Sequence, residues 1–215
     1  MQEKLFVTKA DGSRELFRIN KLKHSLKRAG ASNRVARDII EHITETAYDG
    51  ITTQEIYKQA FAMLGKHEPL GVASRYSLKR AVFDLGPTGF PFEAYDAEIM
   101  CANEKKKKTR QVLKGKCGTH ELDMIARKSD RKISAEMKFH NSPGMKSDLK
   151  VALYVAGRFY DLHGHSEKKS REIPEKWLVT NTKFTKEALK YGVCAGLEMI
   201  SWSYPKEGNL QDLIE

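Results

Sequence analysis

Two segments separated by a short polar turn most constrain how this chain can fold. Residues 119–126 (THELDMIA) and 132–139 (KISAEMKF) have the composition and patterning of adjacent β-strands. Side chains alternate between the two faces of a strand, so Glu136 and Lys138 project from the same face. Pairing of the two strands in a hairpin can bring Asp123 beside them. The sequence therefore predicts that two carboxylates and one amine meet on this hairpin.

This group of side chains suits a divalent cation and a phosphate. Asp123 and Glu136 offer carboxylate oxygens, which are the ligands that hard divalent cations prefer. The ammonium group of Lys138 can orient a water molecule or stabilise negative charge on a phosphate. The simpler alternative is a solvated polar face, which is the usual origin of a Glu-x-Lys pair on a hairpin. Leu122 and Met124 flank Asp123, and these apolar neighbours favour the functional interpretation.

The segment from residue 89 to the C-terminus resembles the Mrr-like branch of the PD-(D/E)XK restriction-endonuclease superfamily. The resemblance rests on motifs in the family's order, which are residues 89–93 (GFPFE), 115–117 (GKC), 120–123 (HELD), 136–141 (EMKFHN) and 177–181 (WLVTN). It implies a nuclease core in which Asp123 and Glu136 bind Mg²⁺ or Mn²⁺. It also implies that Lys138 assists the attacking water and that Glu93 acts as an auxiliary acid. Leu122 replaces the proline of the named motif, as is common in this branch.

The first half of the chain predicts a β-hairpin followed by helices. Residues 5–8 and 14–17 flank Asp11-Gly12, which is a strong turn signal. Four helices are expected, from Asn20 as N-cap to residue 29 with Gly30 as its stop, from Ser32 as N-cap, from Thr52 with Glu55 as a capping box, and over residues 72–85.

This half resembles the ATP-cone domain, a nucleotide-binding regulatory module best known from ribonucleotide reductases. The residues that carry the resemblance are 7–9 (VTK), 11–12 (DG), Lys21, 49–53 (DGITT) and 73–76 (ASRY). It implies that Lys9 and Lys21 meet the phosphates of ATP or dATP, and that Thr53 and Tyr57 line the nucleotide pocket. Ala10 stands where the module commonly has a second basic residue. The alternative is a helical domain with scattered surface lysines.

Residues 86–91 (GPTGFP) divide the chain, because prolines and glycines stop one element and start another. We expect two domains, an N-terminal ATP-cone-like hairpin with a helical bundle over residues 1–88, and a C-terminal α/β restriction-endonuclease-like mixed sheet flanked by helices over residues 89–215. The expected elements of the second domain, besides the hairpin, are helices over 92–103, 147–162 and 185–191 and strands over 109–113, 177–180 and 197–202.

The charge of the chain favours a polyanionic partner. Lys and Arg number 38 against 28 Asp and Glu, a formal net charge of +10, and nucleic acid is the obvious candidate. The residues expected to contact nucleic acid are Lys105, Lys106, Lys107, Lys108, His140, Asn141 and Lys150. The lysine run can equally be a solvated loop, and His140-Asn141 can simply form a turn. Lys150 shares a helix face with Tyr154, which can also be ordinary helix surface.

The remaining features narrow the class of protein. No apolar run approaches the roughly 20 residues needed to cross a bilayer, and the N-terminus lacks a signal-peptide core. The cysteines, Cys101, Cys117 and Cys194, are widely spaced and typical of reduced cytoplasmic thiols. We expect a cytoplasmic Mg²⁺-dependent endonuclease that acts on DNA, does not bind membranes, forms a homodimer or higher homo-oligomer, and is regulated by nucleotide. The alternative is a nucleotide-responsive nucleic-acid-binding protein with an inactive nuclease fold.

Overall fold

The structure is a computed structural model that describes residues 5–86, 89–100, 106–128, 131–163 and 175–214. These residues form two compact units, one of Met1–Asp84 with Ser142–Gly144 and one of Leu85–Asn141 with Met145–Glu215. The units separate between Asp84 and Leu85, whereas the sequence placed the boundary between residues 88 and 89. Each unit has a hydrophobic core of its own.

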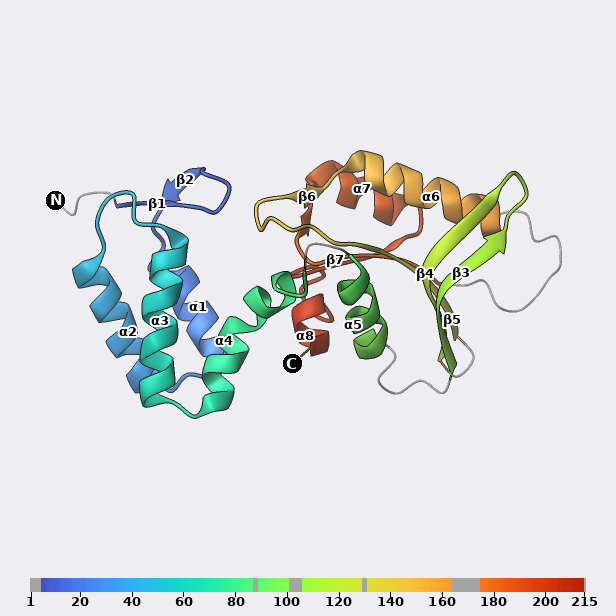
Figure 1. The fold of residues 1–215 in the computed structure, drawn as a ribbon. Helices are drawn as coiled ribbons and strands as arrows, with labels where there is room; N and C mark the ends of the chain where they lie inside the picture. The colour runs from blue at the N-terminus through green and yellow to red at the C-terminus, as the bar shows by residue number, and fades with distance from the viewer. Residues whose placement is uncertain (1–4, 87–88, 101–105, 129–130, 164–174, 215) are drawn as a thin grey trace. The chain divides into compact units, whose positions relative to one another are not determined.

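The first unit consists of a β-hairpin and helices (Figure 1). The hairpin pairs β1 (Phe6–Thr8) with β2 (Arg14–Leu16) in antiparallel register. The helices are α1 (Ile19–Arg28), α2 (Asn33–Thr46), α3 (Thr53–His67) and α4 (Leu70–Phe83). The helices α1, α2 and α3 contribute buried residues four positions apart to one core, as amphipathic helices do, and α4 adds Val72 and Ala73. The buried members include Leu22, Leu26, Val35, Ile39, Ile43, Ile56, Ala60, Leu64, Val72 and Ala73.

The helix ends of the first unit follow the predicted capping with one exception. The Ser32 side chain accepts a hydrogen bond from the Val35 amide, and Thr52 and Glu55 form the reciprocal capping box at the start of α3. Gly30 follows α1 with a φ of 87°, which a glycine adopts without strain. Asn20 as N-cap is wrong, because α1 begins at Ile19. The Phe17 amide still bonds to the Leu5 carbonyl, so the extended chain passes directly into the helix.

The second unit is built on a five-stranded sheet in the order β3-β4-β5-β7-β9. Its strands are β3 (Lys106–Lys114), β4 (Thr119–Lys128), β5 (Arg131–Lys138), β7 (Glu175–Thr180) and β9 (Glu198–Ser201). The strands β3, β4 and β5 pair antiparallel, whereas β5, β7 and β9 pair parallel. The expected mixed sheet is therefore present, and β4 with β5 is the predicted hairpin.

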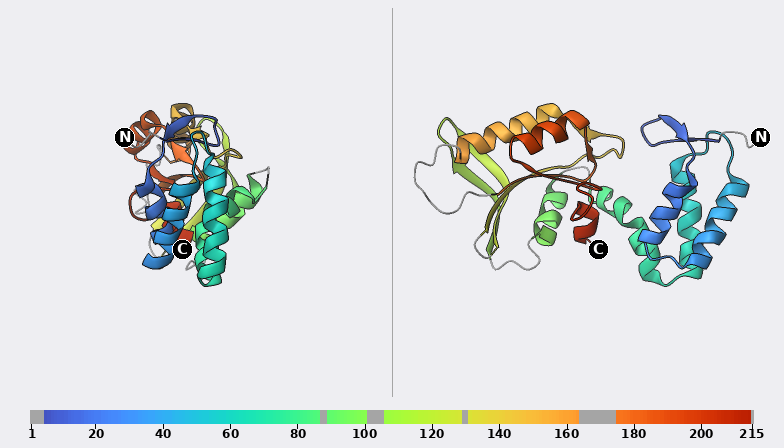
Figure 2. Two further views of the ribbon diagram at one scale, coloured as in Figure 1. Left: turned by 90° about the vertical axis from the view of Figure 1, so that its left-hand side faces the viewer. Right: turned by 180° about the vertical axis from the view of Figure 1, so that it is seen from behind.

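Helices cover both faces of this sheet (Figures 1 and 2). The helices α6 (Leu149–His163) and α7 (Lys186–Cys194) lie on one face, and α5 (Phe90–Met100) and α8 (Leu210–Ile214) lie on the other. On the first face Leu122 and Leu178 pack against Ala152, Val155 and Phe159 of α6. None of the described helices is long and apolar enough to cross a membrane.

Some short elements carry no signal in the sequence. The strands β6 (Lys146–Ser147) and β8 (Lys183–Phe184) pair with each other, and α8 spans a single turn or so near the C-terminus. Their few residues cannot display a period of 2 or 3.6. The strand β3 is also longer than expected, so the described part of the lysine run begins a strand rather than a loop. Residues 101–103, expected to complete α5, lie outside the described residues.

The capping box gives a direct test of how the first unit is held together. Replacement of Thr52 by alanine removes an acceptor for the Glu55 amide and a donor to the Glu55 carboxylate. We expect the free energy of unfolding to fall by about 1 kcal/mol, measured by urea denaturation followed through the helical circular dichroism signal. Thr44→Ala, at an exposed position of α2, is the matched control and should be neutral or slightly stabilising. An equal loss in both variants would show that the box contributes nothing specific.

Candidate functional site

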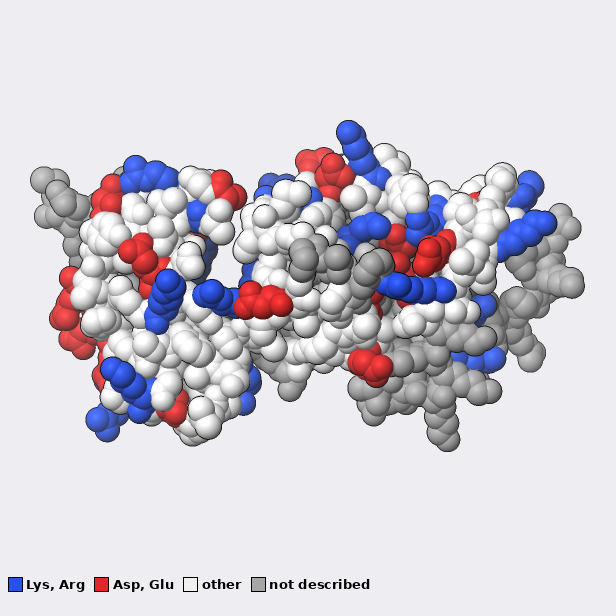
Figure 3. Space-filling model, viewed as in Figure 1, with Lys and Arg blue, Asp and Glu red and all other residues white. Residues whose placement is uncertain are grey.

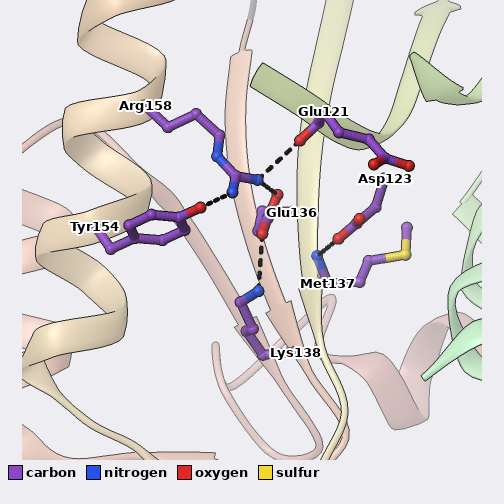
Figure 4. A network of polar contacts seen from close by, with 7 residues as sticks. All are labelled: Glu121, Asp123, Glu136, Met137, Lys138, Tyr154 and Arg158. Carbon is purple, nitrogen blue, oxygen red and sulfur yellow. Dashed lines mark hydrogen bonds and ion pairs between the residues drawn. The ribbon is translucent and has the colours of Figure 1, made fainter. Parts of the chain in front are cut away.

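The strands β4 and β5 stop pairing where Asp123 is reached. Their register runs from Lys128 opposite Arg131 to Met124 opposite Ala135. At the next position the Asp123 carboxylate accepts a hydrogen bond of 2.7 Å from the Met137 amide (Figure 4). A side chain thus links the two strands at the end of their ladder and holds a carboxylate beside β5.

The Glu136 side chain is the buried centre of this region. It is 2% exposed, and it projects from the same face of β5 as Lys138, as the alternation predicted. Its Oε1 atom accepts a hydrogen bond of 2.8 Å from Lys138 Nζ, and its Oε2 atom accepts one from Arg158 Nη1 (Figure 4). A carboxylate removed from water requires such partners, because an unpaired buried charge is strongly unfavourable.

Arg158 on α6 is the residue that sequence reasoning missed. Its Nη1 atom also donates to the Glu121 carbonyl at 2.8 Å, and its Nη2 atom donates to the Tyr154 hydroxyl. The guanidinium carbon lies 4.6 Å from the centroid of the Tyr154 ring. The spacing of Lys150, Tyr154 and Arg158 could have shown that Arg158 shares a helix face with the other two, since residues four apart lie next to each other. The partner of Arg158 on β5 was not visible in that spacing.

Glu93 reaches the same region from α5. Burial raises the pKa of its carboxyl group, and the negative charge of Glu136 raises it further, while Arg110 opposes the shift. Arg110 Nη2 lies 3.6 Å from Glu93 Oε2. The ring of Phe92, next to Glu93, packs against Phe139 at the end of β5, which places the start of α5 beside the Glu136 strand.

Asp123 has the electrostatics of a carboxylate in a crowded acidic site. Burial raises its pKa to about 6, with the charge of Glu136 as the next contribution, and the hydrogen bond from Met137 opposes the rise. Because Glu93 adds to this repulsion, three acidic groups influence one another here. Such a site gains from a bound cation, which would favour the ionised forms.

The residues present fit a magnesium-like ion. Mg²⁺ uses one or two carboxylates and keeps several of its water ligands, and Asp123 and Glu136 supply two such groups. Within the described part of the chain no three or more His, Cys, Asp or Glu side chains form a metal-binding group. Both Glu136 oxygens are bound by Lys138 and Arg158, so a cation would share or displace these partners.

The described residues predicted to contact nucleic acid differ in their surroundings. The His140 ring lies 2.9 Å from Ser147 Oγ, and burial lowers the pKa of the imidazole. Its main chain exchanges hydrogen bonds with the Asn181 side chain, so His140 fixes the end of β5. Asn141 and Lys150 are exposed. Lys105 lies outside the described residues, and the following lysines, Lys106, Lys107 and Lys108, begin β3.

The turn between β3 and β4 is tied to the far end of α6. Asp161 accepts hydrogen bonds from the Cys117 and Gly118 amides at 2.7 Å and 3.1 Å, and it lies 2.7 Å from His120 Nε2. The hydrogen bond with His120 holds the pKa of the Asp161 carboxyl below its ordinary value. His120 is therefore a hydrogen-bonded structural residue, and this contact anchors α6 in the register that presents Arg158.

In the first unit the predicted phosphate-binding lysines converge on one carboxylate. Lys9 Nζ lies 2.7 Å from Glu15 Oε2, and Lys21 Nζ lies 2.9 Å from Glu15 Oε1. These contacts lower the pKa of Glu15, with the Lys9 hydrogen bond the larger cause. Two cations that share one anion at the surface are suited to accept a phosphate in its place.

The start of α3 lies close to Lys9. A parallel β-bridge joins Thr8 to Thr52. Lys9 and Thr53 are the next residues after these two partners, so they lie near each other. Tyr57 lies further along α3, where its ring stacks on Tyr76 of α4 at a centroid distance of 5.5 Å. Lys9 and Lys21 thus share Glu15, Thr53 lies near Lys9, and the Tyr57 ring packs against α4.

Comparison with known proteins identifies the first unit. Residues 5–82 match the family model of the ATP cone domain. The first unit is an ATP-cone domain. The prediction of an ATP-cone domain in the first half of the chain is confirmed.

The comparisons leave the second unit without an assigned activity. An uncharacterized protein of Archaeoglobus fulgidus is 36% identical over 108 residues, which cover 50% of this chain and 58% of that protein. The chain thus spans little more than half the length of this curated relative. A crystallised protein of unknown function, AF1548, is 32% identical with a TM-score of 0.50, over 57% of this chain and 62% of that one. The restriction-endonuclease resemblance remains a prediction.

A more distant likeness extends over more of the chain. Can2 from Sulfobacillus thermosulfidooxidans, solved in complex with cyclic tetra-adenylate, is 11% identical with a TM-score of 0.41. The match covers 84% of this chain and 50% of that one. It is too weak to carry an argument about either fold or function.

The raised pKa of Asp123 predicts how the second unit responds to pH. Between the ordinary value of 3.8 and the folded value of about 6 the folded protein holds a proton that the unfolded chain releases. The free energy of unfolding therefore falls as pH rises through this window, by roughly 2 kcal/mol in metal-free buffer. Asp123→Asn should remove this loss and become more stable than wild type above pH 6. Fluorescence of Trp177 and Trp202, which both lie in this unit, can follow urea unfolding from pH 4 to 7. Glu207→Gln controls for the loss of one exposed negative charge, and a parallel pH profile for wild type and Asp123→Asn would contradict the prediction.

Proposed function

We propose that this protein is a metal-dependent nuclease whose activity responds to nucleotide bound by its ATP-cone domain. The observation that carries the proposal is the meeting of Asp123, Glu136 and Lys138 at the point where β4 and β5 part. These residue types, in this order, are those of the PD-(D/E)XK resemblance. Phosphodiester hydrolysis is the chemistry for which two carboxylates and an adjacent amine are suited.

The chain's own residues take distinct parts in such a reaction. Asp123 and Glu136 would hold Mg²⁺ or Mn²⁺, which when bound supplies Lewis-acid stabilisation of charge on the phosphate and lowers the pKa of water. Lys138, the more exposed partner of Glu136, would orient the attacking water or a phosphate oxygen. Glu93, whose pKa is raised by burial, would act as the auxiliary acid.

Nucleic acid, and DNA in particular, is the substrate that the overall charge favours. On the face in Figure 3 the described Lys and Arg side chains are interspersed with Asp and Glu, so contact would be spread over several positions. The lysine run from Lys105 to Lys108, together with His140, Asn141 and Lys150, would contact the phosphate backbone of the nucleic acid. Cleavage of both strands would require a homodimer or higher homo-oligomer, because one site cuts one strand.

One observation favours a second candidate function. Cationic side chains already bind both oxygens of the Glu136 carboxylate. This arrangement is also expected of a nuclease fold that no longer binds metal. The protein would then be a nucleotide-responsive nucleic-acid-binding protein. Titration of wild type and Glu136→Gln with Mn²⁺ by calorimetry separates the two, since only a metal site loses binding in the variant.

Cleavage assays test the proposed nuclease directly. Asp123→Asn, Glu136→Gln and Lys138→Ala should each lower the rate by roughly 10²-fold or more while the fold is retained. Plasmid, linear duplex, single-stranded DNA and RNA should be incubated with Mg²⁺ or Mn²⁺, with and without ATP or dATP. Lys190→Ala, on the exposed side of α7, controls for the loss of a positive charge. A wild type that cuts none of these substrates, or variants that cut as fast as wild type, would refute the proposal.

Nucleotide binding should depend on the lysines that share Glu15. Lys9→Ala and Lys21→Ala should each weaken ATP or dATP binding by roughly 1.5–3 kcal/mol, because each removes a hydrogen bond to a charged phosphate. Any effect of nucleotide on cleavage or assembly should disappear in the same variants, while cleavage without nucleotide stays near the wild-type rate. Lys23→Ala, an exposed position on α1, is the matched control for calorimetric titration. Equal affinity in all these proteins would place the phosphates elsewhere.

A further inference from the structure

Arg158 binds the central carboxylate of the site, Glu136, yet the proposed function gives it no part. It contacts the Glu121 carbonyl of β4, the Glu136 carboxylate of β5 and the Tyr154 hydroxyl of its own helix (Figure 4). Its side chain is 12% exposed, against 34% for Lys138. A buried, multiply bonded guanidinium at the centre of a site is a stronger constraint than a surface ion pair.

A metal ion on Glu136 would compete with the positive charges that already bind this carboxylate. Its Oε1 atom is bound by Lys138 and its Oε2 atom by Arg158. A cation that ligates Glu136 takes up electron density from these oxygens and repels the positive charges around them. Binding of metal and binding of Arg158 to Glu136 therefore oppose each other, and the coupling is reciprocal.

The guanidinium also has capacity that its present partners do not use. Arg158 Nε is buried and has no hydrogen-bond partner among the described residues. A buried donor without an acceptor is unfavourable. Arg158 would therefore gain from an arrangement in which Nε also has an acceptor. A planar fork with an unused donor matches the oxygens of a phosphodiester.

We propose that Arg158 is a displaceable counter-ion of the metal site, an inference that rests on the proposed nuclease function. Without metal its guanidinium neutralises Glu136, a carboxylate that would hold the divalent cation. When metal binds, the guanidinium leaves Glu136, keeps its attachment to the Glu121 carbonyl, and turns its free donors to the scissile phosphate. Arg158 is thus a catalytic residue that contacts the phosphate, lowers metal affinity and raises the rate of cleavage.

The test uses the opposite signs of these two effects. Arg158→Met removes the charge and keeps an unbranched apolar side chain. Its Mn²⁺ affinity, measured by calorimetry on the full chain, should rise by roughly 5- to 100-fold, while cleavage at saturating Mn²⁺ falls by at least 10-fold. A merely structural role for Arg158 would weaken both. Lys190→Met, which also loses one positive charge in the same unit, should change neither by more than about twofold.

Two further measurements keep the outcome decisive. Should Arg158→Met not fold by circular dichroism, Arg158→Lys retains a cation but loses the planar fork, and the same rise in affinity with loss of rate is expected at smaller size. Unchanged or weaker Mn²⁺ binding in the folded variant, or unchanged cleavage at saturating metal, overturns the role of Arg158 alone. If wild type binds no Mn²⁺, or if Glu136→Gln binds it as well as wild type does, the nuclease proposal is overturned as well.

Discussion

The buried carboxylate of Glu136 is the interaction on which the site of the second unit depends. A side chain 2% exposed and charged must be surrounded by donors, and here Lys138 from the same strand and Arg158 from α6 supply them. The energy of such a pair is not a reliable source of stability, because desolvation offsets most of the attraction. Its effect is to fix geometry, since removing one partner leaves a buried charge. The helix α6 is consequently held against β5 in one register. Hydrogen bonds from the β3–β4 turn to Asp161 fix the other end of α6.

Around this pair the sheet brings further acidic groups close to Glu136, because Asp123 and Glu93 both interact with its charge. The strands β4 and β5 part at Asp123, and the Met137 amide then bonds to a carboxylate rather than continuing the ladder. Burial and the charge of Glu136 together raise the pKa of Asp123 to about 6. Perturbed carboxylates of this kind are concentrated at functional sites. A bound cation, as in the proposed function, would offset the repulsion between Asp123, Glu136 and Glu93.

The ATP-cone domain follows the same physical pattern at its surface. Lys9 and Lys21 come from the hairpin and from α1, and Glu15 draws their ammonium groups together. The bridge between Thr8 and Thr52 brings the capped start of α3 to the same place. Helix N-termini attract anions through their free amides, so lysines beside such a terminus form a setting in which a phosphate can replace the internal carboxylate.

The sequence alone determined the local elements of both units and which side chains share a face. The capping box of Thr52 with Glu55, the stop at Gly30 and the common face of Glu136 and Lys138 depend on neighbours in the chain, and so they are encoded by spacing. The bond from Met137 to Asp123, the pairing of Glu136 with Arg158 and the link between His140 and Asn181 join residues 14 to 41 positions apart. Only the order of strands in the sheet and the packing of α6 on it bring such residues within reach. The raised pKa of Asp123 belongs to the same class, because burial is a property of the whole fold and not of any segment.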